Sequence, residues 1–264
     1  MLKTLSCTAL LVATFACSAA EPTHDQATTL TVLSSGGIMG AIRGVAPAYE
    51  HTYGVKLNVL AAPSMGQTPQ AIPNRLKRGE PADVVLMVGS ALDILVADGK
   101  ADQTSRIDLG KSFIAMAVRK GEPKPAIGTM GELRQVLLDS PSVAYSDSAS
   151  GVYLSKTLFP RMNLGEGFAH KAHMIPAEPV GKVVARGEAA IGFQQLSELK
   201  PVPGIDIVGL IPAEGQKMTM YSGAVVANSQ HRAAAQALLD YMASAQADAA
   251  IEKSGLTPLP HSAH

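Results

Sequence analysis

The chain has 264 residues, of which 47% are hydrophobic and 4% aromatic, and its 22 basic residues balance its 22 acidic ones. A neutral chain with few aromatic side chains lacks the basic surplus and the stacking surface that nucleic-acid binding requires, so we expect no nucleic-acid partner. The two cysteines, Cys7 and Cys17, lie within the first twenty residues. The sequence after residue 20 therefore offers no disulfide or thiolate chemistry.

The first twenty residues predict a cleavable export signal. Lys3 precedes an apolar stretch at residues 9–15, and Ser18-Ala19-Ala20 has the small-x-small pattern of a cleavage site. This stretch is shorter than the roughly 18 apolar residues that a membrane helix needs, and no later segment reaches that length. We therefore expect residues 1–20 to be removed, leaving a periplasmic protein with no membrane insertion.

Strand and helix patterns alternate along residues 30–98. Strands are predicted at 30–33, 55–61 and 84–87, and helices at 38–53, 72–78 and 91–98. This alternation predicts a parallel sheet covered by helices. Ligands of such sheets bind at the carboxyl ends of the strands.

A second alternating set follows a strand at 113–118 and a proline-marked segment at 119–125, where we place a crossing between lobes. Strands are predicted at 143–145, 173–175, 190–193, 205–208 and 218–227, and helices at 131–138, from 152, at 231–243 and at 248–254. The predicted lobes are 21–117 plus 222–264, and 118–221. Two such lobes are typical of solute-binding proteins, which close about a hinge.

Two segments rich in serine and glycine follow predicted strands where helices begin. The N–H groups at a helix N-terminus lack intrahelical partners and attract anions, and small residues let a ligand approach the backbone. The alternative is a helix cap with a tight turn. We favour ligand contact and expect the segments to face each other across a cleft. The residues are Ser34, Ser35, Gly36 and Gly37 in one segment, and Ser148 and Ser150 in the other.

Five motifs make the chain similar to the molybdate-binding periplasmic protein family. They are residues 31–33 (TVL), 79–84 (GEPADV), 150–153 (SGVY), 176–180 (PAEPV) and 188–193 (EAAIGF). The resemblance implies an α/β, two-lobed type 2 periplasmic-binding-protein fold with mixed sheets and a hinge between the lobes. It also implies ligand contacts at Ser64, Ser150 and Val180.

The resemblance is incomplete at positions where the family contacts its oxyanion. The serine that opens the first helix in the family corresponds to Gly37 here, and the tyrosine that caps the oxyanion corresponds to Gln195. The loop at 63–73 is also longer than the family's. These departures imply a pocket that is too roomy for tetrahedral molybdate, in which Gln195 hydrogen-bonds a planar carboxylate.

Residues 71–80, 145–153 and 192–195 resemble a divergent branch of that family, whose members include an enzyme that interconverts trans- and cis-aconitate. The resemblance implies isomerisation by an allylic proton shift, without metal or other cofactor, and a small anionic polycarboxylate as the ligand. The alternative is a binding protein that delivers molybdate or a small organic anion to an ABC transporter. Only that alternative requires a permease as a partner.

An allylic proton shift needs a base within about 3 Å of the substrate methylene group. Asp147, Glu178 and Tyr145 are candidates for this base, and the sequence does not rank them. Each carboxylate has an alternative role as a helix cap or as the partner of a neighbouring charge.

A trianionic substrate also favours a cation in the site. Arg43, in the first two turns of the first helix, and Arg75, near the long loop, are candidates, although each has an alternative role as a solvated surface residue. His170 and His173 are spaced by three, but no third ligand accompanies them in a pattern that zinc sites show. The sequence therefore predicts no metal site.

Overall fold

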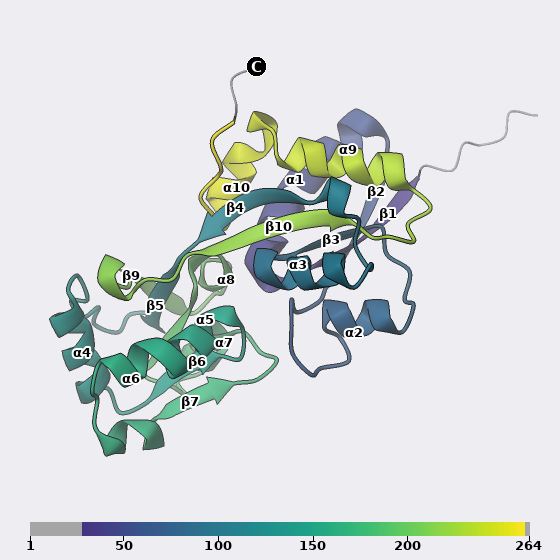
Figure 1. Cartoon of the computed structure of the whole chain (residues 1–264). Coiled ribbons are helices and arrows are strands. Elements are labelled where there is room, and N and C mark those ends of the chain that lie inside the picture. The colour runs from purple at the N-terminus through teal and green to yellow at the C-terminus, as the bar shows by residue number, and fades with distance from the viewer. Residues whose placement is uncertain (1–27, 262–264) are drawn as a thin grey trace, which may run out of the picture.

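The computed structural model describes residues 28–261. This part of the chain forms two α/β lobes, each built on a five-stranded mixed sheet (Figure 1). None of its helices is long and apolar enough to span a membrane. The predicted export signal and both cysteines lie outside the described residues.

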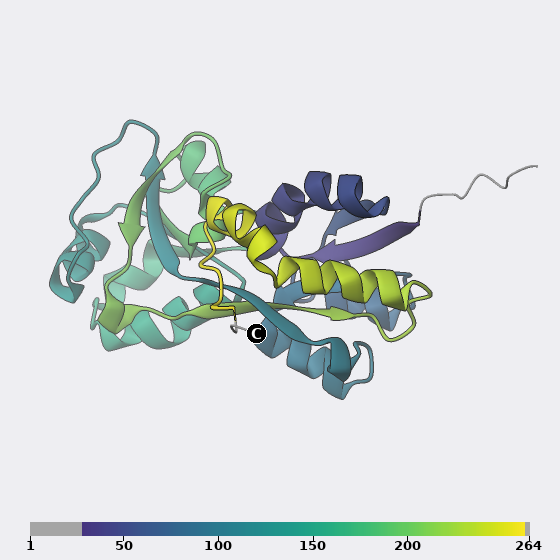
Figure 2. The ribbon, with the colours of Figure 1, turned by 90° about the horizontal axis from the view of Figure 1, so that it is seen from above.

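The first sheet has the strand order β2-β1-β3-β10-β4, in which the first three strands are parallel and the last two pair antiparallel. Helices α1, α9 and α10 pack on one face and α3 lies on the other (Figure 2). The strands are β1 (Thr29–Ser34), β2 (Lys56–Ala61), β3 (Val84–Val88), β4 (Ile107–Ser112) and β10 (Thr219–Val225). The helices are α1 (Gly36–Tyr53), α2 (Ile72–Lys77), α3 (Gly89–Ala97), α9 (Arg232–Met242) and α10 (Asp248–Ser254).

The second sheet has the order β7-β6-β8-β5-β9, with β7, β6 and β8 parallel and β5 antiparallel to both of its neighbours. The strands are β5 (Ile114–Arg119), β6 (Val143–Ser146), β7 (Ala172–Ile175), β8 (Ile191–Gln195) and β9 (Ile205–Leu210). The helices are α4 (Met130–Asp139), α5 (Ala149–Tyr153), which continues through a π-turn into α6 (Phe159–Arg161), α7 (Val180–Ala185) and α8 (Leu196–Leu199). Short 3-10 turns lie at Gln103–Ser105, Glu166–His170, Ala213–Gly215 and Ala245–Ala247.

Helix α1 shows how the sequence pattern sets the packing. Its side chains Ile38, Ile42, Val45 and Tyr49, spaced by three or four residues, are buried against the sheet. The helix ends at Gly54, which adopts the left-handed conformation that favours glycine. The five residues of β3 are all buried, because helices cover both faces of its sheet.

The mixed α/β fold with two lobes is the one that the sequence predicted. Three elements were not predicted: β4, in which Asp108, Gly110 and Lys111 interrupt the apolar pattern, and the short helices α7 and α8. Six and four residues are too few for a helical period to be recognised.

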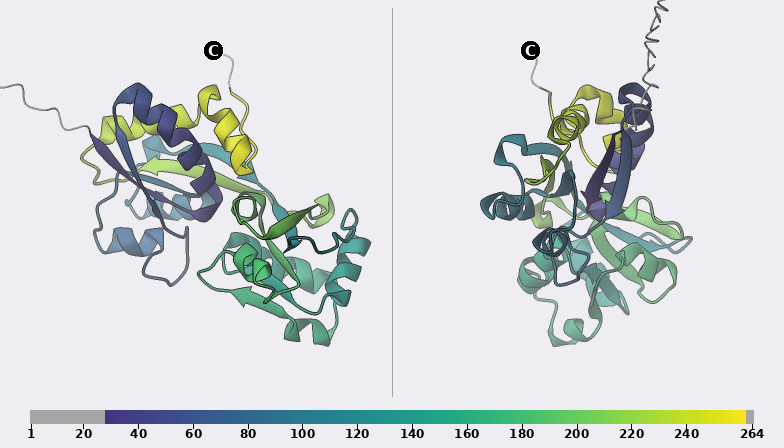
Figure 3. Two further views of the ribbon diagram at one scale, coloured as in Figure 1. Left: turned by 180° about the vertical axis from the view of Figure 1, so that it is seen from behind. Right: turned by 90° about the vertical axis from the view of Figure 1, so that its right-hand side faces the viewer.

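The lobes are joined where β4 passes into β5 and where the chain enters β10 (Figure 3). Because β5 belongs to the second sheet, the first crossing lies at Phe113, before the segment at 119–125 where it was predicted. The whole of β10 belongs to the first sheet. Residues 219–221, which were predicted to be part of the second lobe, therefore belong to the first. The apolar run at 113–118 gave no sign that the chain changes sheets at its first residue.

Candidate functional site

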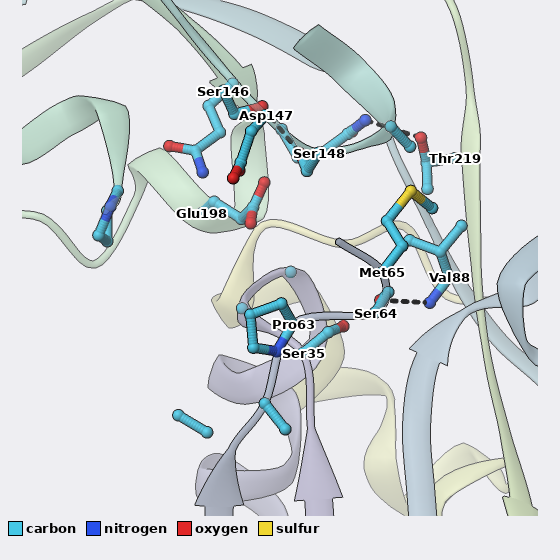
Figure 4. Close-up of a pocket in the computed structure, with 18 of the residues that line it drawn as sticks. Ser35, Pro63, Ser64, Met65, Val88, Ser146, Asp147, Ser148, Glu198 and Thr219 are labelled. Carbon is cyan, nitrogen blue, oxygen red and sulfur yellow. Dashed lines mark hydrogen bonds between the residues drawn. The ribbon is translucent and has the colours of Figure 1, made fainter. Parts of the chain in front are cut away.

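A cavity of about 270 Å³ lies between the two lobes and is lined from both (Figure 4). Strands β1, β3, β6 and β8 end at this cavity, and α1, α3, α5, α7 and α8 begin there. We call it the interlobe cleft. Its polar lining residues include Ser35, Ser64, Thr219 and Tyr221 from the first lobe, and Ser146, Asp147, Ser148, Glu178, Gln194, Gln195 and Glu198 from the second.

The cleft suits an anion without supplying a cation. The N-terminus of α1, an 18-residue helix, opens into it at Ser35, Gly36 and Gly37. The backbone N–H groups and the dipole of a helix N-terminus favour negative charge. None of the described residues that line the cleft is lysine, arginine or histidine.

The two glycines of α1 allow side chains from other elements to approach the helix backbone. A Cβ atom on Gly36 would lie 2.9 Å from Oε1 of Glu198, and one on Gly37 would lie 1.9 Å from the hydroxyl of Tyr221. The sequence suggested that the glycine at position 37 makes the pocket roomier, but in the structure it does not. It makes room for a tyrosine that β10 supplies.

Hydroxyl groups line both sides of the cleft. Ser146 Oγ lies 2.7 Å from Ser148 Oγ and 3.2 Å from Ser150 Oγ, so these three hydroxyls form one network. On the other side, Ser64 Oγ accepts the N–H of Val88 at 3.0 Å. The Ser35 hydroxyl is buried and has no hydrogen-bond partner among the described residues.

Gln195 connects the lobes across the cleft. Its Nε2 donates to Thr219 Oγ1 on β10 at 2.7 Å, and its buried Oε1 has no partner among the described residues. A buried polar atom without a partner costs free energy unless a ligand or water satisfies it. The free atom of Gln195 is therefore an acceptor, which does not bond an ionised carboxylate, and the side-chain donor that the sequence assigned to a ligand is bonded to Thr219.

Glu198, in the first turn of α8, is a cleft residue that the sequence analysis missed. Its Oε2 is shielded from solvent and has no hydrogen-bond partner among the described residues. Burial, together with the charge of Asp147, raises the pKa of this carboxyl group to about 7, against the lowering effect of hydrogen bonds from Gln194 and Gln195. The group is therefore close to half-protonated at neutral pH.

Tyr221 was also missed, and its phenol packs in the core of the first lobe with the hydroxyl against α1. Burial and the neighbouring Glu198 raise the pKa of this phenol well above its usual value, so it stays protonated. Two signals in the sequence point to these residues: an acidic residue soon after the strand that ends in Gln194 and Gln195, and an adjacent glycine pair at a helix start.

The predicted catalytic candidates differ in their positions. Asp147 lines the cleft, is exposed, and accepts the N–H of Ala177 at 3.2 Å. Glu178 lines the cleft too, but Arg186 binds its carboxylate at 2.8 Å. Tyr145 does not line it, because its ring packs edge-on against Phe159 beneath α6.

Both predicted cations lie outside the cleft. Arg43 is exposed on α1, beyond the turn that lines the cavity. Arg75 is held by Glu80 through bonds of 2.8 and 3.2 Å. In these positions neither guanidinium neutralises an anion in the cleft.

Three more predicted contacts are buried behind the lining. Ser34 donates its hydroxyl to the Ser35 carbonyl, and Ser150 is part of the serine network. Val180 packs in the second lobe, and its N–H donates to Gln194 Oε1 at 2.9 Å. Of the predicted contacts, those that line the cleft are Ser35, Gly36, Gly37, Ser64, Ser148 and Gln195.

No group of three histidine, cysteine, aspartate or glutamate side chains in residues 28–261 is arranged to hold a metal ion. The hydrogen-bond donors of the cleft are instead hydroxyl, amide and backbone N–H groups. Such a set suits an oxyanion or a carboxylate, which accepts hydrogen bonds on all its oxygens.

The chain matches known proteins over nearly its whole length. Residues 30–257 match a family model described as bacterial extracellular solute-binding protein. An aconitate isomerase from a Pseudomonas species is 68% identical over 259 residues, which cover 98% of this chain and 97% of that protein.

Solved structures share the fold at low identity. The periplasmic molybdate-binding protein of Azotobacter vinelandii has a TM-score of 0.70 at 18% identity, covering 88% of this chain and 100% of that one. The sulfate-binding protein SubI of Mycobacterium tuberculosis has a TM-score of 0.67 at 20% identity, covering 88% and 87%. The predicted resemblance is thus confirmed, and the chain belongs to the bacterial extracellular solute-binding protein family.

Proposed function

We propose that this protein is an aconitate isomerase, which interconverts trans- and cis-aconitate in the periplasm. The relative that supports this activity is 68% identical and aligned over nearly the full length of both chains. The cleft offers hydroxyl groups and a helix N-terminus to a small polycarboxylate.

The observation that carries the proposal is the carboxyl group of Glu198, one oxygen of which is buried without a partner among the described residues. In a cleft that serves only to bind an anion, a carboxyl group with a buried, unpartnered oxygen is a disadvantage, because it repels the ligand and is costly to desolvate. A carboxyl group with a pKa near neutrality is useful when a proton must be moved.

The reaction itself is an allylic proton shift. A base takes a proton from the methylene carbon, and the electron pair of that C–H bond forms the new carbon–carbon double bond. The old double bond then releases its pair to its far carbon, which takes up a proton, so the proton count does not change. Charge that builds up on the adjacent carboxylate is stabilised by N–H and O–H donors, as in an oxyanion hole.

A transport receptor for molybdate or a small organic anion is the alternative within this family. The departure at Gln195 remains its weak point, whereas the space at Gly37 is occupied by Tyr221. We therefore expect weak molybdate binding. A receptor also has no use for the proton-transfer capacity of Glu198.

The test is incubation of the purified protein with trans-aconitate, without added cofactor, while cis-aconitate is followed by chromatography. We expect conversion well above a buffer control, and calorimetric binding of aconitate that is tighter than that of molybdate. If there is no conversion but molybdate binds tightly, the protein is a receptor.

A further inference from the structure

Glu198 stands apart from the other carboxylates of the cleft. Figure 4 shows Glu198 and Asp147 close together on the side contributed by the second lobe, across from Ser64. Glu198 Oε1 lies against the backbone of α1 at Gly36, and its Oε2 is buried and unpartnered among the described residues. Glu198 therefore lines the cleft beside the start of α1, and no salt bridge among the described residues neutralises its carboxylate.

The other groups in the cleft that could transfer a proton are bonded to other residues, exposed to solvent or permanently protonated. Arg186 binds Glu178 and also Glu188, so both carboxylates are engaged in an ion pair. Asp147 is exposed and bonded to the Ala177 N–H, where water screens it. The Tyr221 phenol stays protonated, so it does not serve as the base.

We propose that Glu198 is the catalytic residue that removes the proton from the substrate methylene carbon and returns the same proton to the far carbon of the allylic unit. This proposal rests on the proposed aconitate isomerase function. In it, the Glu198 carboxylate accepts the proton while the Tyr221 hydroxyl and the N-terminus of α1 stabilise the negative charge of the intermediate. The protonated carboxyl group then donates the proton, which restores the starting carboxylate.

The burial of Glu198 Oε2 explains why one group performs both transfers. A proton on an oxygen that is shielded from solvent exchanges slowly with water while the substrate covers the cleft. The titratable groups that face Glu198 are Asp147 and Tyr221, and the Tyr221 phenol stays protonated. Because Glu198 must be ionised to accept the proton, kcat/KM should rise with pH and level off above about pH 7.

Glu198→Gln tests the assignment directly, because it keeps the shape of the side chain and removes the base. We expect kcat to fall by about 10²–10⁴-fold, the usual contribution of general acid–base catalysis, while calorimetry shows trans-aconitate binding unchanged or tighter. The matched control is Glu252→Gln, an identical change at an exposed position on α10, which should leave both quantities unchanged. If kcat of Glu198→Gln stays within about threefold of the wild type, Glu198 is not the base.

A label experiment on the wild-type protein tests the return of the proton and does not depend on a variant that folds. In D₂O, product isolated at low conversion should contain clearly less than one deuterium per molecule when measured by mass spectrometry. One full deuterium per product molecule at the earliest times would overturn transfer by a single shielded group. Wild-type protein that shows no isomerisation at all contradicts the proposed function instead, so the two failures are distinguishable.

Discussion

At the scale of single residues, two adjacent glycines determine which side chains meet at the start of α1. Gly36 lets the Glu198 carboxyl group reach the helix backbone, and Gly37 does the same for the Tyr221 hydroxyl. Neither glycine has a positive φ angle, so conformational freedom is not the reason for them. They are needed because a Cβ atom at either position would occupy the space of another side chain.

Gly37→Ala should damage both the site and the fold. The new methyl group would lie 1.9 Å from the Tyr221 hydroxyl, and the buried phenol has little room to move. We expect a loss of about 1–3 kcal/mol in the free energy of unfolding, measured in urea, together with impaired isomerisation.

The matched control for this change is Gly131→Ala. Gly131 is also the second residue of its helix, α4, but its nearest neighbour is Thr129 Oγ1 at 3.9 Å. This change should be neutral, or stabilising by up to about 1 kcal/mol, because alanine favours the helix. Equal free energies of unfolding for the two variants would show that the space at Gly37 is not restricted.

At the scale of elements, the segment before β10 is tied to the start of β5 by one side chain. Gln216 Oε1 accepts the Ile114 N–H at 2.8 Å, and its Nε2 donates to the Ile114 carbonyl at 3.0 Å. Both segments carry the chain from one lobe to the other. The amide of Gln216 therefore fixes the two crossings side by side.

Gln216→Ala should destabilise the protein by about 1–3 kcal/mol, because it leaves the buried N–H of Ile114 without a partner. Urea unfolding measures this loss. The control is Gln135→Ala on α4, where the amide bonds only the exposed Asp139 carboxylate, and we expect a change within about 0.5 kcal/mol. Similar losses in the free energy of unfolding for both variants would mean that the hydrogen bonds to Ile114 do not stabilise the protein more than a surface hydrogen bond does.

At the scale of the whole molecule, the cleft is assembled only when both lobes are in place. Gln195 bonds Thr219 across it, and Ser112 Oγ lies 3.2 Å from Ser197 Oγ beside the crossing. Two lobes joined by two short crossings are the arrangement in which hinge closure around a ligand occurs. The free hydroxyl of Ser35 and the N–H groups at the start of α1 are donors for an anion, and contacts with them provide the differential interaction that such closure requires.

We therefore predict that trans-aconitate makes the molecule more compact. The radius of gyration from small-angle X-ray scattering should fall when the protein is saturated with trans-aconitate, and should not change with sodium chloride of equal ionic strength. An identical radius with and without the ligand would show that the lobes do not move on binding.

Much of this protein was determined by local sequence. Apolar runs with period 2 or 3.6 are strong where strands and helices are buried, so β1, α1, β3 and β8 were predicted within a residue or two. The start of α1 was recognisable too, because its serines and glycines directly follow an apolar strand, although such residues also serve as helix caps. The positions of these strands and helices depend on residues that are close together in the sequence.

The composition of the cleft was decided by tertiary structure alone. Glu198 and Tyr221 are 23 positions apart in the sequence and belong to different lobes, and only the crossing of the chain into β10 brings them to the same helix end. Arg43 and Arg75 were both candidates in the sequence for a cation in the site. In the structure Arg43 lies on α1 beyond the turn that lines the cleft, and Arg75 is bonded to Glu80, so neither side chain reaches the cleft. Hydrophobic periodicity specifies which residues are buried, whereas the depth and partners of a polar side chain depend on contacts between distant segments.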